Sequence, residues 1–200
     1  MGKKNGNKAK GAAAAVADAD ADVAKAVAPA AKTWPVRVLS WASELGDQPQ
    51  LRFLCGGAIV AGVLTRNERL ARAGVRALAA HETATAAKNF VKHRVDRARP
   101  RSFLEDRSDA SHRPEPGRNT GKEETSFPSG HSAGASSVAR ALARDYPEYA
   151  VYAYGAAGLV ALAQIPRCAH YPTDVGAGIA VGLAAEAAVS AVLPRPAIEE

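Results

Sequence analysis

Cysteine is scarce in this sequence of 200 residues, and its scarcity limits the kinds of site the protein can contain. The two cysteines, Cys55 and Cys168, lie far apart among apolar or small residues. They do not make a disulfide framework, and no cluster of cysteine and histidine has the spacing of a zinc site. We therefore expect two small buried thiols.

Aromatic residues are also few, at 6% of the chain, whereas lysine and arginine number 26 and give a net charge of +6. Proteins that bind single-stranded nucleic acid interleave basic with aromatic residues, so the composition argues against a nucleic-acid partner. It favours anionic substrates or lipid surfaces. Abundant alanine and glycine suit closely packed helices, and the length allows one domain with a sizeable core.

The first 32 residues lack the uninterrupted apolar core and the cleavage site of a signal peptide, so we do not expect secretion by that route. Basic residues come first, and an alanine-rich run follows them. We expect residues 1–32 to form a mobile tail with some helical tendency. Residues 34–45 are too few to span a bilayer, but Trp34 and Trp41 suit a helix that lies in the membrane interface.

Five later stretches are apolar enough to form core helices. A spanning helix needs ~20 apolar residues, with ~17 as a lower limit, and several of these stretches are at or below that limit. The mean hydropathy of −0.17 is low for a membrane protein, although the tail and a polar central loop dilute it. Because the last two stretches contain so little charge, we favour a membrane bundle over a soluble one. The predicted fold class is all-α, a membrane-embedded bundle of about five core helices plus an N-terminal interfacial helix, with the core helices over residues 51–65, 70–90, 131–146, 149–165 and 175–193.

If these stretches span a membrane, the polar connections fall on two faces. Arginines dominate one face, which the positive-inside rule assigns to the cytoplasm. That face would hold the turns at residues 66–69 and 144–148, the N-terminal lysines and Arg195. The opposite, non-cytoplasmic face would bring together residues 92–101, 129–131 and 166–174. We expect the functional site where these three segments meet.

A short turn signal opens the third apolar stretch. Pro128 and Gly130 do not suit a helix interior, whereas Ser129 is a good N-cap, so a helix begins here with free backbone N–H groups at its mouth. Such a mouth binds anions, and His131 places a titratable imidazole beside it. A capped helix with an incidental histidine is the commoner meaning of this pattern, so the turn indicates a site only together with partners.

Lys92 and Arg99 are the first such partners. They are seven residues apart, so on one helix they would share a face and hold a phosphate between them. The alternative is that the basic run over residues 92–101 forms a solvated helix end, which is the commoner fate of such runs.

His170 and Asp174 are the second pair of partners. They are four residues apart, across Tyr171-Pro172-Thr173. An aspartate there can accept a hydrogen bond from one imidazole nitrogen and leave the other nitrogen free to attack a substrate. A structural role for the pair is the alternative, because histidine and aspartate also pair at ordinary helix starts.

Together these residues resemble the three signature motifs of the phosphatidic acid phosphatase type 2 superfamily. That superfamily includes lipid phosphatases, bacterial acid phosphatases and vanadium haloperoxidases. The motifs occur in the family's order, and the resemblance covers about residues 51–193. We assign residues 33–195 to one such helical domain, with residues 101–127 as its polar active-site loop. The matching segments are Lys92 with Arg99-Pro100 after six residues, Pro128-Ser129-Gly130-His131, and His170-Tyr171-Pro172-Thr173-Asp174.

The resemblance implies a role for each matching residue. His170 would be the nucleophile that takes the phosphoryl group, with Asp174 orienting it. His131 would protonate the leaving alcohol and later activate water. The groups implied to bind the phosphate oxygens are Lys92, Arg99, Ser129 and Gly130. This chemistry requires neither a metal nor another cofactor.

One position departs from the family pattern. The third motif normally opens with Ser-Arg, and here those positions are Ala163 and Gln164. Arg167 follows three residues later, where it either reaches the phosphate or is an ordinary loop arginine. Losing one charged donor to the transition state costs about 2.7 to 4 kcal/mol, so an uncompensated Gln164 would make a slow enzyme.

The resemblance therefore implies a phosphatase that hydrolyses a lipid phosphomonoester or isoprenyl diphosphate through a phosphohistidine. Phosphatidate and phosphatidylglycerophosphate are substrates of the same class. We expect an integral protein of a bacterial inner membrane, with its site on the non-cytoplasmic face and its oligomeric state open. One alternative is a membrane protein that binds lipid phosphate with weakened or lost catalysis, because of Gln164. Another is a soluble acid phosphatase or a vanadate-dependent haloperoxidase.

Overall fold

The computed structural model describes residues 2–106, 111–118 and 121–193, with side chains from residue 11 onward. Helices form most of the described chain, and a single pair of two-residue strands accompanies them. The predicted all-α class is confirmed.

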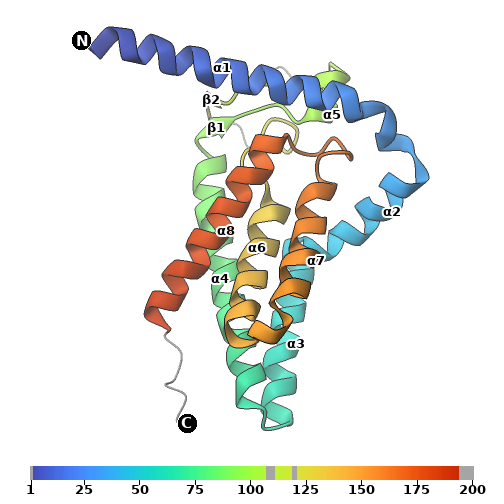
Figure 1. Ribbon diagram of the computed structural model, residues 1–200, viewed down its shortest axis with the longest axis vertical. Coiled ribbons are helices and arrows are strands. Elements are labelled where there is room, and N and C mark those ends of the chain that lie inside the picture. Colours follow the sequence, from blue (N-terminus) through green and yellow to red (C-terminus); the bar gives the residue numbers. More distant parts are fainter. Residues whose placement is uncertain (1, 107–110, 119–120, 194–200) are drawn as a thin grey trace.

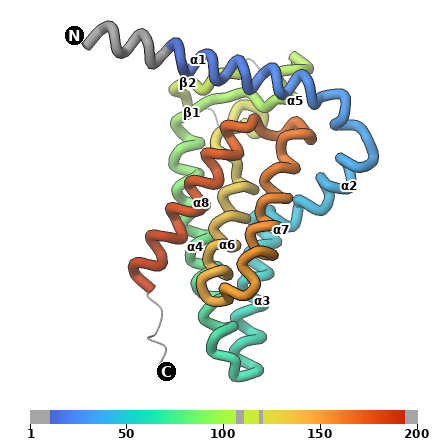
Figure 2. The backbone as a smooth tube through the Cα atoms, in the orientation of Figure 1, coloured from blue at the N-terminus to red at the C-terminus, as the bar shows by residue number. Residues whose placement is uncertain are grey.

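Five helices form the bundle, and they run alternately down and up (Figure 1). Each helix matches one predicted stretch, with small shifts at the ends. The helices are α3 (Gln48–Leu64), α4 (Glu68–Lys92), α6 (Gly130–Asp145), α7 (Ala150–Ala163) and α8 (Pro172–Val192). The C-terminal ends of α4 and α7 and the N-terminal ends of α6 and α8 therefore lie at the same end of the bundle (Figure 2).

Small residues allow the central helices to approach closely. Gly178 and Gly182 of α8 face α6, where an added Cβ would lie 2.5 Å from the Ser129 carbonyl oxygen and 2.3 Å from that of Ala133. A side chain at either glycine would therefore push the two helices apart. This close contact matters for function, because α6 and α8 carry two of the three predicted motifs.

The N-terminal helix corrects the expectation of a mobile tail over residues 1–32. Helix α1 (Gly2–Val27) lies across the upper end of the bundle, above the strands and α5 (Pro100–Leu104) (Figure 1). Its buried residues Ala17, Asp20, Ala21 and Ala24 follow the i, i+3, i+4, i+7 pattern of one helical face. The helix is therefore packed along that face. It lies at the pocket end of the bundle, whereas the N-terminal lysines were expected at the other end, with the arginine-rich turns. The side chains of those lysines are outside the described residues.

Two short 3-10 turns and a ten-residue helix connect α1 to the bundle. These elements are η1 (Ala28–Lys32), α2 (Trp34–Ser43) and η2 (Glu44–Gly46). Helix α2 is the predicted interfacial helix, and it leaves Trp34 and Trp41 74% and 79% exposed. Asp47 then caps α3, because its Oδ1 accepts a hydrogen bond from the Gln48 N–H at 2.9 Å.

Buried ion pairs close the lower end of the bundle. Arg76 of α4 lies 3.0 Å from Asp145 of α6 and also donates to the Leu193 carbonyl at 2.7 Å. Arg140 of α6 lies 2.6 Å from Glu186 of α8. The turn η3 (Pro147–Tyr149) follows α6 at this end. These pairs satisfy charged groups inside the bundle, far from the predicted site. Arg195, expected at the same end, lies outside the described residues.

The bundle surface is strongly apolar. Among the described helices, α8 is the one that is long and apolar enough to cross a membrane by length and composition. Large apolar side chains are also exposed along the other bundle helices, for example Phe53 and Leu64 of α3 and Val151 and Tyr152 of α7, each at least 74% exposed. Exposed apolar area of this extent marks a surface that contacts lipid or protein.

Candidate active site

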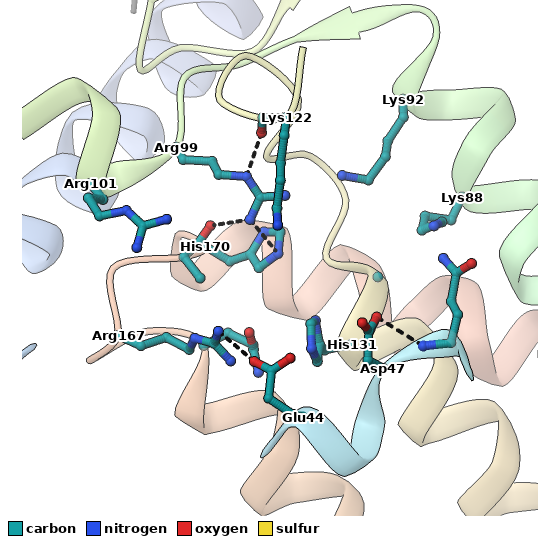
Figure 3. A pocket seen from close by; sticks show the side chains of 14 residues that line it. Glu44, Asp47, Lys88, Lys92, Arg99, Arg101, Lys122, His131, Arg167 and His170 are labelled. Carbon is teal, nitrogen blue, oxygen red and sulfur yellow. Dashed lines mark hydrogen bonds and ion pairs between the residues drawn. The ribbon is translucent and has the colours of Figure 1, made fainter. Parts of the chain in front are cut away.

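A pocket of about 230 Å³ lies at the upper end of the bundle, where the three predicted segments meet (Figure 3). It contains seven of the nine predicted site residues and seven others. The predicted lining residues are Lys92, Arg99, Gly130, His131, Gln164, Arg167 and His170. The others are Glu44, Asp47, Gln48, Lys88, Arg101, Lys122 and Ala169. Its volume lies below the ~300 Å³ at which pockets for drug-sized ligands begin, so it suits a small charged group.

The first motif reaches the pocket by a different path from the one its spacing predicts. Helix α4 ends at Lys92, and Arg99 lies in extended backbone beyond strand β1 (Val95–Asp96), so the two cations do not share a helical face. The strand pairs with β2 (Glu115–Pro116) in an antiparallel register and reverses the chain. Both side chains nevertheless point into one pocket (Figure 3).

Backbone carbonyls hold these two cations. Lys92 Nζ donates to the Thr125 carbonyl at 2.5 Å. Arg99 donates from Nε to the Lys122 carbonyl at 2.6 Å and from Nη1 to the Ala169 carbonyl at 3.2 Å. Each carbonyl orients a basic side chain without forming an ion pair with it, so both side chains remain available to an anion.

In the second motif, the two turn residues do different work. Ser129 is buried behind the pocket, where its Oγ accepts from the Ser132 hydroxyl at 2.9 Å and its N–H donates to the Asp174 carbonyl at 3.0 Å. Ser129 also caps α6, as its sequence position predicts, because its Oγ accepts from the Ser132 N–H at 3.4 Å, and its own N–H fixes α6 to α8. Gly130 and His131 line the pocket at the mouth of the helix.

In the third motif, His170 lies between Arg99 and Asp174. Its Nε2 is 3.4 Å from Arg99 Nη1, and its Nδ1 is 3.7 Å from Asp174 Oδ2. The second distance exceeds a normal hydrogen bond. Burial lowers the pKa of His170 to about 4, although Asp174 pulls it upward. The imidazole is therefore neutral at neutral pH, which is the state a nucleophile requires.

Arg97 is a site-supporting residue that the sequence interpretation missed. It is fully buried and its Nη1 donates to Asp174 Oδ1 at 2.5 Å. The alternative of a solvated basic end for residues 92–101 is therefore wrong for Lys92, Arg97 and Arg99, which are buried or line the pocket. Spacing alone could not separate Arg97 from its neighbours, because the residues that bury it come from distant segments.

Gln164, at the position of the usual family arginine, and Arg167 both line the pocket. Gln164 is buried at the pocket, but its Nε2 donates to the Val160 carbonyl at 2.8 Å. Its Oε1 has no partner among the described residues. Arg167 also faces the pocket, with Nη2 2.7 Å from Glu44 and Nη1 donating to the Ser43 hydroxyl at 2.9 Å. The pocket thus contains a guanidinium on this side, although it is displaced by three positions along the sequence.

Lys88 is the second missed residue, and a signal for it was present. It precedes Lys92 by one helical turn, so both lie on the same face of α4. It is buried, lines the pocket close to Gly130, and has no hydrogen-bond partner among the described residues. An unpaired buried ammonium is costly unless an anion joins it.

Glu44 and Asp47 bring negative charge to the same pocket. Their carboxylate oxygens and a ring nitrogen of His131 lie within 4.8 Å of one another, a grouping that could hold a cation. Nothing in the sequence marked these two acids, because η2 and the start of α3 reach the pocket only through the path of α2. They sit beside His131 together with Arg167, which pairs with Glu44, whereas Arg99 lies beside His170 (Figure 3).

The two imidazoles therefore have different surroundings. His170 lies beside Arg99 and Lys92, and His131 lies beside two carboxylates and Arg167. Such a site can bind a dianionic group, attack it from one side and deliver a proton on the other.

Sequence comparison identifies the family to which this fold and site belong. The model of the PAP2 superfamily matches residues 73–196, more than half of the sequence, so the chain belongs to the PAP2 superfamily. This confirms the family resemblance of the three motifs. No curated protein sequence matches the chain significantly.

A solved structure has the same fold. It is the crystal structure of a transmembrane PAP2-type phosphatidylglycerolphosphate phosphatase from Bacillus subtilis. The TM-score is 0.66 with 22% sequence identity, and the match covers 93% of this chain and 90% of that chain. Because it covers 93% of this chain, the structural likeness extends beyond the residues that the family model matches.

Proposed function

We propose that the protein is a metal-independent lipid phosphatase that works through a phosphohistidine on His170. The observation that carries this proposal is the pocket itself. Two imidazoles, His170 and His131, line it together with Lys92 and Arg99, and Asp174 lies behind His170. Membership of the PAP2 superfamily supports a phosphatase of the lipid-phosphate type.

The first step forms a bond between His170 Nε2 and phosphorus. The phosphate ester bond breaks, and His131 donates a proton to the leaving oxygen. Asp174 stabilises the positive charge that develops on the imidazole, by accepting from its Nδ1–H. In the second step His131 takes a proton from water, the resulting hydroxide attacks phosphorus, and the N–P bond breaks to release inorganic phosphate and neutral His170.

The cations stabilise the charge on the transferring phosphoryl group. Arg99 and Lys92 bind two of its oxygens, and the Gly130 N–H at the mouth of α6 donates to a third. Arg167 supplies the charge that Gln164 lacks, because its guanidinium faces the same pocket. If the Arg167 side chain turns from Glu44 toward a bound phosphate, its guanidinium exchanges one anionic partner for another.

A membrane location is supported by the bundle surface and by the likeness to a transmembrane protein. Exposed apolar side chains suit a lipid environment, and the exposed tryptophans of α2 suit its interface. The pocket is large enough for a phosphate group but not for a lipid, so the acyl or prenyl part lies outside it. The substrate class is a lipid phosphomonoester such as phosphatidylglycerophosphate or phosphatidate, or an isoprenyl diphosphate.

We further propose a bacterial inner membrane with the site on its non-cytoplasmic face. The arginine-rich turns at residues 66–69 and 144–148 lie at the end remote from the pocket, which supports that orientation. Accessibility of single cysteines in the two ends to an impermeant thiol reagent tests it in cells. Labelling of the Arg66 turn from outside would reverse the orientation.

The second candidate is a lipid-phosphate-binding protein without turnover. It is favoured by one observation, the use of the Gln164 amide inside α7. Phosphate release from lipid and soluble phosphomonoesters, with and without chelator, separates the two functions. We expect turnover by the wild type that chelator leaves unchanged. An inert wild type that gains turnover as Gln164→Arg would establish the second candidate, and activity confined to soluble esters without detergent would indicate a soluble acid phosphatase.

A further inference from the structure

A buried chain of charges links the N-terminal helix to the proposed nucleophile. Asp20 of α1 accepts from Arg97 Nη2 at 2.7 Å, and Asp174 accepts from Arg97 Nη1 at 2.5 Å. Their side chains are at most 4% exposed. Asp174 in turn faces Nδ1 of His170, so three contacts connect α1 with the ring of the proposed nucleophile.

Arg97 is held on every side. Its Nε donates to the His112 carbonyl at 2.8 Å, and its guanidinium stacks on the Tyr171 ring at 4.0 Å from the centroid. These hydrogen bonds and the stacking on Tyr171 fix the orientation of the planar guanidinium. Arg97 therefore presents Asp174 in one position.

Asp20 also acts directly on the first turn of α8. Its Oδ1 accepts from the Thr173 N–H at 3.2 Å, and its Oδ2 accepts from the Thr173 hydroxyl. The first N–H groups of a helix have no partner within that helix, so a carboxylate from α1 satisfies one of them. Asp174 is the next residue, and its Oδ2 accepts from the Tyr171 N–H at 2.9 Å.

The charge balance gives Asp20 a second effect. One guanidinium faces two carboxylates, so its positive charge is shared between them. Without Asp20, Arg97 would neutralise Asp174 more completely and weaken its attraction for the imidazolium that develops on His170. Asp20 thus keeps Asp174 both in place and sufficiently negative.

We propose that Asp20 and Arg97 are positioning residues for phosphoryl transfer, which makes α1 a part of the catalytic apparatus. The inference rests on the proposed phosphatase function. It predicts a loss in kcat, because the contacts act on the nucleophile, and little change in phosphate binding, because Lys92 and Arg99 are untouched.

Helix α1 offers two matched controls for Asp20. Asp22 is exposed and pairs with Lys25 of the same helix, so Asp22→Asn removes the same charge without affecting the site. Asp18 attaches α1 through His112 and Arg113, each at 2.9 Å, so Asp18→Asn weakens the docking of the helix. Neither aspartate touches Arg97 or Asp174.

The test uses the full chain in detergent or proteoliposomes, with a short-chain lipid phosphate as substrate. It measures kcat, KM, inhibition by inorganic phosphate, Tm, and the amount of trapped phosphoenzyme per chain. For each variant, kcat is divided by the fraction of chains that can be trapped as phosphoenzyme, which counts the active sites. We expect Asp20→Asn to lose about 10- to 100-fold in this corrected kcat, with KM and the inhibition constant of phosphate within about twofold of the wild type. Asp20→Glu should regain part of the loss, and Asp22→Asn should match the wild type.

The outcomes separate the two levels of the proposal. If Asp20→Asn and Asp22→Asn have equal kcat in an active wild-type background, this inference is wrong and the phosphatase function stands. The total activity of Asp20→Asn could fall only as much as the number of chains that can be phosphorylated, or Asp18→Asn could show the same loss in kcat. Either result would give α1 a structural role only. Should Asp20→Asn not fold, Asp20→Glu and Arg97→Lys carry the test, and wild-type kcat in both would overturn the inference. An inert wild type would overturn the proposed function and this inference with it.

Discussion

Nε2 of His170 lies 3.4 Å from Nη1 of Arg99, so the proposed attacking atom and a proposed phosphate-binding cation are adjacent. A phosphate that replaces this contact with a bond to Arg99 is presented directly to the imidazole. The pairing therefore combines binding and attack at one place, and the predictions below follow from it.

His170 should remain neutral far below the pH at which ordinary histidines titrate. Its pKa of about 4 results first from burial, with Arg99 and Lys92 lowering it and Asp174 raising it. The neutral form is the reactive one, so reactivity should be lost as pH falls through about 4. The pH dependence of its modification by diethyl pyrocarbonate, followed by mass spectrometry, checks this. A midpoint near the usual value of about 6.5 would contradict the buried, neutral nucleophile.

His131→Ala should have an effect that depends on the leaving group. A lipid or other alkyl phosphate leaves as a poor alkoxide and needs the proton, so kcat should fall by about 100- to 10,000-fold. With p-nitrophenyl phosphate, whose leaving group is stable as an anion, the loss should be much smaller. Equal losses for the two substrates would assign His131 to binding and not to proton transfer.

Lys88→Met should weaken phosphate binding. The buried ammonium lines the pocket without a partner among the described residues, so a bound phosphate supplies its counter-ion. Loss of a charge-assisted hydrogen bond should raise the inhibition constant of inorganic phosphate by roughly tenfold or more. The control is Lys25→Met, which removes an exposed lysine from α1. Unchanged inhibition in Lys88→Met would exclude Lys88 from the phosphate site.

Arg167→Ala should lower kcat by about 100-fold, because it removes the guanidinium that replaces the family arginine. Gln164→Arg in the Arg167→Ala background should restore turnover, since it returns the charge to the usual position. The kcat values of the two single variants and the double variant check this. Wild-type kcat in Arg167→Ala would show that the arginine belongs only to its pair with Glu44.

The sequence predicted the bundle and most of the pocket for a clear physical reason. Alternating apolar stretches and charged turns place every second connection at one end, so Arg99, His131 and His170 had to meet there. Lys92 and Arg99 were correctly paired by motif but wrongly placed on one helical face, because strand β1 interrupts the helix between them.

The residues that were missed depend on contacts between distant segments. Arg97 resembles its basic neighbours in sequence, and only Asp20, Asp174 and Tyr171 make it a buried residue. The residues that α1 buries have helical spacing in the sequence, but most of them are alanines. Alanine is too weak an apolar signal to distinguish a packed helix from a tail. Glu44 was hidden in a turn whose path depends on α2.

The most direct test is to trap the phosphoenzyme with a 32P-labelled lipid phosphate and acidic or alkaline quenching. The account predicts a label that is stable to alkali, labile to acid, located on His170, absent from His170→Ala and unaffected by chelator. A label on another residue, turnover that persists in His170→Ala, or loss of both label and turnover with chelator would contradict the phosphohistidine mechanism.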